Sequence, residues 1–163
     1  MADTKITAHP GEQSVLMTAD FDAPRDLVFR AYTEPELIVQ WLGPRRLTMT
    51  VERQENRDGG RWRFVNHDAD GTEYGFHGVF HGDPSPERTV RTFEFEGAPG
   101  HVSLEELQIE ERDGRSYVRA LAVYQSVEAR DTMVQGGMEV GVREGWERLE
   151  ELLGRLKAER RAA

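Results

Sequence analysis

Histidines are the first candidates for chemistry in this sequence, which contains five of them and no cysteine. His77 and His81 are four residues apart, a spacing that on a helix would place both rings on one face as metal ligands. They fall, however, in an alternating stretch that predicts a β-strand, where they share the face opposite Phe76 and Phe80. We therefore expect surface histidines and no metal site.

The sequence contains no recognisable catalytic constellation. His67 and His101 lie in or near predicted turns, and no side chain is placed to orient either ring as a general base. The glycine pairs at 59–60 and 136–137 are not followed by the lysine and the serine or threonine of a phosphate-binding loop. We therefore predict no catalytic residue and no cofactor, and a non-enzymatic role is favoured over an enzymatic one.

Arg91 and one tyrosine are the polar groups best placed to orient a ligand. Arg91 shares strand parity with Phe93 and Phe95, so its guanidinium could point inward and hold a carboxylate or phenolate, or instead reach water at the end of the sheet. Tyr117 and Tyr124 have opposite parity on the last strand. Tyr124 shares its face with two small alanines that leave room, and we prefer it as the inward residue.

The elements that must position these groups include a long C-terminal helix. An apolar stripe with helical spacing runs through residues 136–156, and it consists of Met138, Val142, Trp146, Leu149, Leu152, Leu153 and Leu156. Gly137, Gly141 and Gly145 recur every four residues beside it, although each glycine costs roughly 0.5–1 kcal/mol relative to alanine. Either another segment approaches this helix closely or the glycines leave space for a cavity. The pattern alone favours close packing.

The rest of the chain alternates with a period of two. Residues 14–21 predict a first strand, Pro24 opens a helix, and Thr33 with Glu36 has the capping-box form that starts a second short helix. Strands joined by tight turns follow from residue 47, and a change of parity predicts a β-bulge at Glu105 and Glu106. Ser126 caps a short helical turn before the long helix.

Together these elements predict an α+β fold: a curved antiparallel sheet of about six to seven strands wrapped around the long C-terminal helix, with two short helices after the first strand. We expect one domain over residues 13–158, between a flexible tail at 1–12 and a frayed tail at 159–163.

Composition narrows the function classes. The 163 residues include 37% hydrophobic and 31% charged residues, which describes a globular protein with a solvated surface. A formal charge of −9 argues against binding to nucleic acid, which requires a basic surface. No apolar run approaches the roughly 18 residues that would insert into a membrane, and no signal sequence is visible. A cytoplasmic location is the default expectation.

Several short segments resemble the helix-grip superfamily, which includes START lipid-transfer domains, birch-pollen-allergen-like proteins and polyketide cyclases (SRPBCC). The closest resemblance is to its bacterial branch named after the C-terminal domain of the activator of heat-shock-protein ATPase. The segments that carry it are 21–29 (FDAPRDLVF), 41–44 (WLGP), 58–64 (DGGRWRF), the strand around Gly78 with the prolines after it, and Ser126 leading to 137–141.

The resemblance implies a cavity between the sheet and the C-terminal helix that binds an apolar or amphipathic small molecule as a carrier, sensor or sequestering module. A cyclase or dehydratase acting on an aromatic or polyketide-like substrate is one alternative, and a co-chaperone-like interaction module is another; a homodimer stays open. The cavity-lining residues that we predict are Trp41, Trp62, Phe64, Phe76, Phe80, Arg91, Phe93, Phe95, Tyr124, Met138, Gly141, Val142, Gly145 and Trp146.

Overall fold

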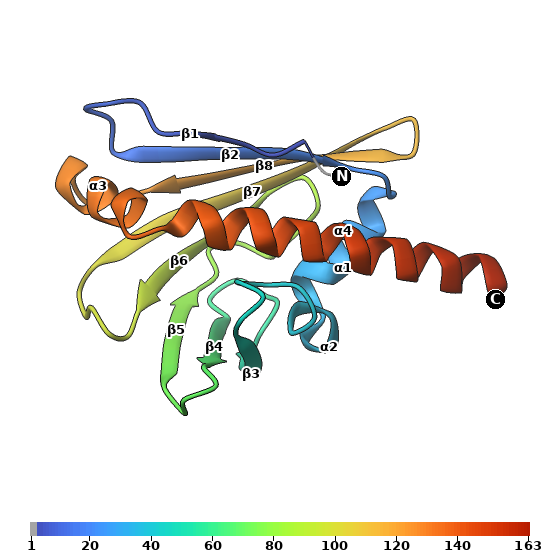
Figure 1. The fold of residues 1–163 in the computed structure, drawn as a ribbon. Helices are drawn as coiled ribbons and strands as arrows, with labels where there is room; N and C mark the ends of the chain where they lie inside the picture. Colours follow the sequence, from blue (N-terminus) through green and yellow to red (C-terminus); the bar gives the residue numbers. More distant parts are fainter. Residues whose placement is uncertain (1–2) are drawn as a thin grey trace.

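The computed structural model describes residues 3–163 as one antiparallel sheet with a long helix lying across it (Figure 1). The eight strands have the order β1-β2-β8-β7-β6-β5-β4-β3. Their bounds are β1 Lys5–Thr7, β2 Ser14–Phe21, β3 Thr48–Gln54, β4 Arg61–His67, β5 Glu73–Val79, β6 Thr89–Phe95, β7 Val102–Arg112 and β8 Arg115–Val123. The helices are α1 Arg25–Thr33, α2 Pro35–Ile38, α3 Val127–Gln135 and α4 Met138–Ala162. The predicted α+β class and its helix-on-sheet arrangement are confirmed.

Strand alternation determines which face of the sheet is covered. In β2, Val15, Met17, Ala19 and Phe21 are all buried, and the residues between them are not. The buried set packs with α4 in one core cluster, so we call this side of the sheet the inner face and the opposite side the outer face.

The second half of α4 packs against the sheet. The helix starts after Gly137, whose positive φ of 88° suits glycine at a sharp turn between helices. Its buried residues are Gly145, Trp146, Leu149, Leu152, Leu153 and Leu156. Each of the large apolar side chains contributes about 1.5–3 kcal/mol by leaving water. No residue between 138 and 144 is buried, so the first two turns of α4 cover the sheet more loosely.

The buried residues form two cores. The larger joins β2, β8, α1 and α4 around residues such as Phe21, Leu27 and Leu149. The smaller, built from Ile38, Trp62, Phe64 and Phe80, lies over β4 and β5 beneath α2. Inward-facing residues of β6 and β7 lie between the two.

Regular secondary structure extends into both segments that were expected to be tails; residues 1–2 of the first lie outside the described residues. Residues 5–7 form the edge strand β1, in which Lys5 pairs with Thr18 of β2, whereas the whole segment 1–12 was expected to be a tail. A three-residue strand is too short to show alternation. At the other end α4 continues to Ala162 where fraying was expected, and Arg160 forms a 2.7 Å ion pair with Asp26 of α1.

Two local predictions are wrong. Thr33 does not cap α2: it is still the last residue of α1, and its hydroxyl donates to the Phe29 carbonyl at 2.8 Å. β7 pairs without a register shift through residues 105–106, so the predicted bulge there is absent. The parity change arises because Leu104 lies exposed on the outer face while Leu107 packs against the core. The register shift found in the sheet lies instead in β3, between Val51 and Arg53.

Candidate functional site

Aromatic side chains of β4, β5 and β6 form a continuous layer on the inner face, which we call the aromatic wall: Trp62, Phe64, Phe76, Phe93 and Phe95. Neighbouring ring centroids within it lie 4.8–5.7 Å apart, a normal range for aromatic packing. Trp62 and Phe64 are buried, whereas Phe76, Phe93 and Phe95 keep part of their surface accessible. All five are residues that the sequence predicted to line the site, and the predicted Phe80 is buried in the smaller core beside them.

Gly78 fixes the position of the Trp62 ring. The two residues are paired across β4 and β5, and the Trp62 indole Nε1 donates to the Thr92 carbonyl at 3.2 Å. A Cβ atom on Gly78 would lie 1.9 Å from that carbonyl oxygen and 2.7 Å from Nε1. Glycine is therefore required here by the close approach of the indole and β6.

An ion pair lies on the inner face beside this wall. Arg91 of β6 and Glu105 of β7 are directly opposite each other, with Arg91 Nε 2.9 Å from Glu105 Oε1. The Arg91 guanidinium lies 4.1 Å above the centroid of the Trp62 ring, within cation–π range. The two side chains keep 23% and 29% of their surface exposed, so solvent reaches both charged side chains.

The structure thus places Arg91 inward and gives it a partner that the sequence analysis missed. The expected bulge at residues 105–106 obscured the direction of Glu105. In an uninterrupted strand, Glu105 has the same parity as Leu107 and Ile109, both of which pack into the larger core. That shared parity was the available signal.

Two phenols lie close to the ion pair. Tyr32 of α1 accepts a 2.9 Å hydrogen bond from Trp146 Nε1, and enclosure of its hydroxyl raises its pKa well above the usual value. Burial, reinforced by the negative charge of Glu105, raises the pKa of Tyr124 to about 12. The Tyr124 hydroxyl is directed at Met138 Sδ, 3.8 Å away. Both phenols are neutral donors at physiological pH. Tyr117, the tyrosine that was not preferred as the inward residue, points to the outer face.

Two buried polar side chains on the inner face lack a hydrogen-bond partner among the described residues. Ser103 of β7 is 5% exposed and Asn66 of β4 is 7% exposed. Their unpartnered polar atoms nevertheless keep some solvent access. Within residues 3–163, the side-chain polar atom that is fully buried and has no hydrogen-bond partner is Gln54 Oε1. The hydroxyl and the amide therefore face accessible space, as groups that meet water or a ligand do.

The glycine row of α4 is explained by close packing at one position. A Cβ on Gly145 would lie 3.4 Å from both Gly43 N and Trp41 O, so the loop after α2 rests against this helix. The nearest atom to a Cβ on Gly141 is Pro44 Cδ at 3.9 Å. Both glycines were predicted to line a cavity, and both instead face the loop at 41–44.

The remaining predicted residues divide between core and site edge. Trp41 is buried, donates from Nε1 to the Ala31 carbonyl at 2.9 Å and packs edge-on against Tyr32. Trp146 is also buried, where it meets Phe21 in a T-shaped contact. Met138 and Val142, from the first turns of α4, are partly buried against the larger core.

The predicted outer-face position of His77 agrees with the geometry. His77 lies on the outer face, with Nδ1 3.0 Å from Glu96 Oε2, and Arg63 contacts the same carboxylate at 2.8 Å. Arg63, with a smaller contribution from His77, lowers the pKa of Glu96 to about 2. Across residues 3–163, no cluster of three or more His, Asp or Glu side chains has the arrangement of a metal site.

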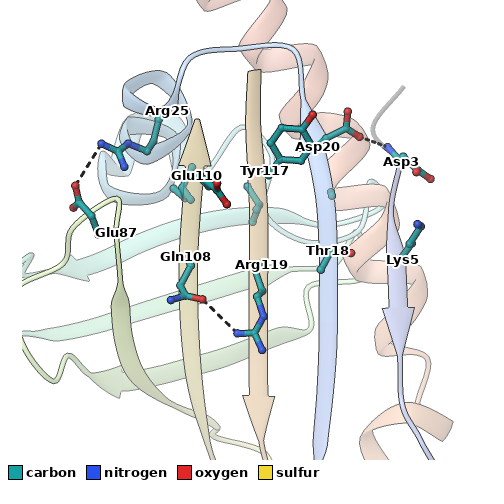
Figure 2. Close-up of a pocket in the computed structure, with 13 residues that line it drawn as sticks. Asp3, Lys5, Thr18, Asp20, Arg25, Glu87, Gln108, Glu110, Tyr117 and Arg119 are labelled. Carbon is teal, nitrogen blue, oxygen red and sulfur yellow. Dashed lines mark hydrogen bonds and ion pairs between the residues drawn. The ribbon is translucent and has the colours of Figure 1, made fainter. Parts of the chain in front are cut away.

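A second candidate surface lies on the outer face. A hollow of about 710 Å³ lies over β7, β8, β2 and β1. Figure 2 shows its lining residues, with Tyr117 and Arg119 near the middle and Lys5 at the edge. Its Arg25 and Glu87 side chains pair with each other across one rim at 3.4 Å. A smaller hollow lies beside Asp22 and Lys157. Neither hollow lies between the sheet and α4. On the inner face, the partial exposure of Arg91 and Glu105 shows that solvent reaches these two side chains.

An antiparallel sheet that holds a long C-terminal helix, with two short helices after β2 and polar groups on the covered face, is the helix-grip architecture. The chain belongs to the family described as Activator of Hsp90 ATPase homolog 1-like protein, whose model matches residues 22–154. A comparison with curated proteins finds no match. Within the described part of the chain, no helix combines the length and apolar character needed to span a membrane.

Solved structures of bacterial proteins share this fold. A solution structure from Arthrobacter aurescens has a TM-score of 0.85 at 24% identity and covers 93% of this chain and 91% of its own. A Rhodobacter sphaeroides protein has a TM-score of 0.84 at 25% identity, with 93% and 99% covered. Protein Ms6760 of Mycobacterium smegmatis has 0.83 at 22% identity, with 94% and 97% covered.

Proposed function

We propose that this protein binds an apolar or amphipathic small molecule on the inner face of its sheet, beneath the first two turns of α4. The observation that carries the proposal is the Arg91–Glu105 ion pair, which is set against the aromatic wall yet keeps about a quarter of its surface accessible. A carrier, sensor or sequestering protein in the cytoplasm would use such a site.

The energetic cost of removing charged groups from water supports a binding role for this region. An ion pair placed among apolar side chains contributes little to stability, because dehydration of the charges offsets their attraction. A well-packed apolar pair would serve a purely structural core at least as well. Polar groups that converge in an aromatic setting are typical of ligand sites, where they fix orientation while apolar contact supplies affinity.

The aromatic wall provides the apolar contact. Phe76, Phe93 and Phe95 are only partly buried, so a ligand laid on them would remove further apolar surface from water. Each square ångström so removed stabilises the complex by about 25 cal/mol before the cost of association is counted. A flat ring system fits best, because it can stack on these side chains.

The anchoring of α4 allows access without loss of the core. Leu149, Leu152 and Leu153 hold its second half against β2, β8 and α1, whereas Met138 and Val142 are only partly buried. A ligand can therefore displace the first two turns while the large core remains intact. Gly136 and Gly137, at the junction with α3, form the turn about which such a movement would occur.

An enzymatic role is a second candidate, favoured by one observation. A cyclase or dehydratase needs an acid or base within the site, and Glu105 supplies an inward carboxylate close to the neutral phenols of Tyr32 and Tyr124. A co-chaperone-like interaction would use an exposed surface, of which the outer hollow around Tyr117 is an example.

Native mass spectrometry of the freshly purified protein, paired with Nile red fluorescence, tests the binding proposal. We expect either a co-purifying mass or saturable dye binding. Phe93→Ala should weaken the dye complex several-fold, because Phe93 lies in the aromatic wall. Leu104→Ala should not, because Leu104 is 47% exposed on the outer face. Bare protein together with no saturable dye binding would contradict the proposal.

A further inference from the structure

We propose that the inner-face site selects an uncharged ligand whose polar head presents a hydrogen-bond donor beside an acceptor, and that it discriminates against carboxylates. Primary aromatic amides, lactams and hydroxy-ketones belong to this class. The inference rests on the proposed binding function and specifies its ligand. It arises because Glu105 already occupies the position opposite Arg91 that a ligand carboxylate would be expected to take.

The first argument is the balance of charge. Arg91 and Glu105 neutralise each other, and the neighbouring phenols of Tyr32 and Tyr124 are uncharged at neutral pH, as phenols ordinarily are. Arg130, whose charge acts on Tyr124, is buried and paired with Asp131 at 2.8 Å. Both of these described cations already have a carboxylate partner. A carboxylate entering this region would therefore bring a further negative charge, and burying such a charge without compensation is costly.

The second argument is the hydrogen-bonding capacity left open by the pair. Within residues 3–163, the contact between Arg91 Nε and Glu105 Oε1 is the hydrogen bond that joins them. The Nη1 and Nη2 groups of Arg91 remain as donors, and Oε2 of Glu105 remains as an acceptor. A donor and an acceptor side by side are complementary to a neutral head that carries the opposite groups in the same order.

Ser103 adds a third contact point. It precedes Glu105 by two residues on β7, so its hydroxyl is on the same face of the same strand. The hydroxyl has no partner among the described residues although the side chain is 5% exposed. A hydroxyl can donate or accept, so it suits a carbonyl oxygen as well as an amide N–H.

Calorimetric titration with naphthalene-carboxamide and naphthalene-carboxylate at neutral pH tests the inference, since the two probes share their ring system and differ mainly in head-group charge. We expect the wild type to bind the carboxamide at least roughly tenfold more tightly. Glu105→Gln leaves Arg91 uncompensated at nearly unchanged volume, so it should reduce this preference or reverse it. Glu106→Gln is the matched control, because Glu106 lies next in sequence but faces outward and pairs with Arg88 at 3.2 Å.

The outcomes separate this inference from the binding proposal. Equal or tighter binding of the carboxylate by the wild type, or a preference that Glu105→Gln leaves unchanged, overturns the ligand class while the binding function stands. Binding of neither probe, with no saturable Nile red binding, overturns both. If Glu105→Gln proves unfolded by circular dichroism, Arg91→Gln replaces it: that variant leaves Glu105 uncompensated, so carboxylate binding should fall further than carboxamide binding, and an equal fall overturns the inference.

Discussion

The indole of Trp146 donates a 2.9 Å hydrogen bond to the hydroxyl of Tyr32, which joins the middle of α4 to α1. Trp146 is buried against Phe21 in the larger core, 4% of its surface being exposed. The hydroxyl that accepts this bond lies close to the Arg91–Glu105 pair, whose charges influence its pKa. One polar contact therefore connects the helix anchor to the border of the proposed site.

Tyr32→Phe should lower the free energy of unfolding by about 1–3 kcal/mol, because it leaves a buried indole N–H without a partner. Urea denaturation followed by tryptophan fluorescence measures this loss. Tyr117→Phe is the control: Tyr117 is 38% exposed on the outer face, so the loss there should stay below about 0.5 kcal/mol. Equal effects at the two positions would show that the indole finds another acceptor.

Two glycines of α4 should respond in opposite directions to a larger side chain. Gly154 has nothing within 4 Å of a Cβ position, so Gly154→Ala should stabilise the protein by about 0.5–1 kcal/mol through helix propensity. Gly145→Leu should destabilise it by about 2 kcal/mol or more, because the Trp41–Gly43 backbone already lies 3.4 Å from a Cβ there. Thermal unfolding of both variants checks the contrast, and a neutral Gly145→Leu would contradict the close approach.

Gly78 should tolerate even alanine poorly. A Cβ atom would overlap the Thr92 carbonyl oxygen, a backbone atom that can move only if β5 and β6 separate. We expect Gly78→Ala to cost about 2–4 kcal/mol and to change Trp62 fluorescence, because its indole crosses this position. Gly71→Ala provides a comparison with a different cause: its φ of 90° strains alanine, but nothing lies within 4 Å. Gly71→Ala should leave the indole signal unchanged.

Alternation was sufficient to predict the fold because one face of the sheet is covered and the other is wet. In β2 every second residue is buried. Along β8 and into the residue that follows it, the same rule separates inward Tyr124 from outward Tyr117. The inward direction of Arg91 follows from the same parity. These relationships involve residues that are close together in the chain, so one sequence is enough to predict them.

Contacts between distant segments could not be predicted in this way. The 3.4 Å approach of Gly145 to the loop at 41–43 joins residues about a hundred positions apart. The glycine row alone favoured close packing of this kind, but it did not identify the segment that packs there. Glu105 was obscured by a single exposed leucine, Leu104, which imitated the parity change of a bulge. An apolar residue on the wet face carries no sign in the sequence of which face it occupies.

The Arg63–Glu96 pair on the outer face should make the stability of the protein depend on pH in the acidic range. Arg63 holds the pKa of Glu96 near 2 in the folded protein, below its ordinary value of 4.5. The depressed pKa means that the folded state favours the carboxylate, so this contribution is fully present above about pH 4.5 and is lost as the pH falls toward 2.

Glu96→Gln should be less stable than the wild type at neutral pH and should lose less stability on acidification across that window. Urea unfolding at a series of pH values measures both effects, and parallel pH profiles for the two proteins would show that Arg63 does not stabilise the carboxylate. Glu110→Gln is the comparison, since Glu110 pairs with Arg112 while both side chains are more than half exposed, where solvent screens the pair and a smaller change is expected.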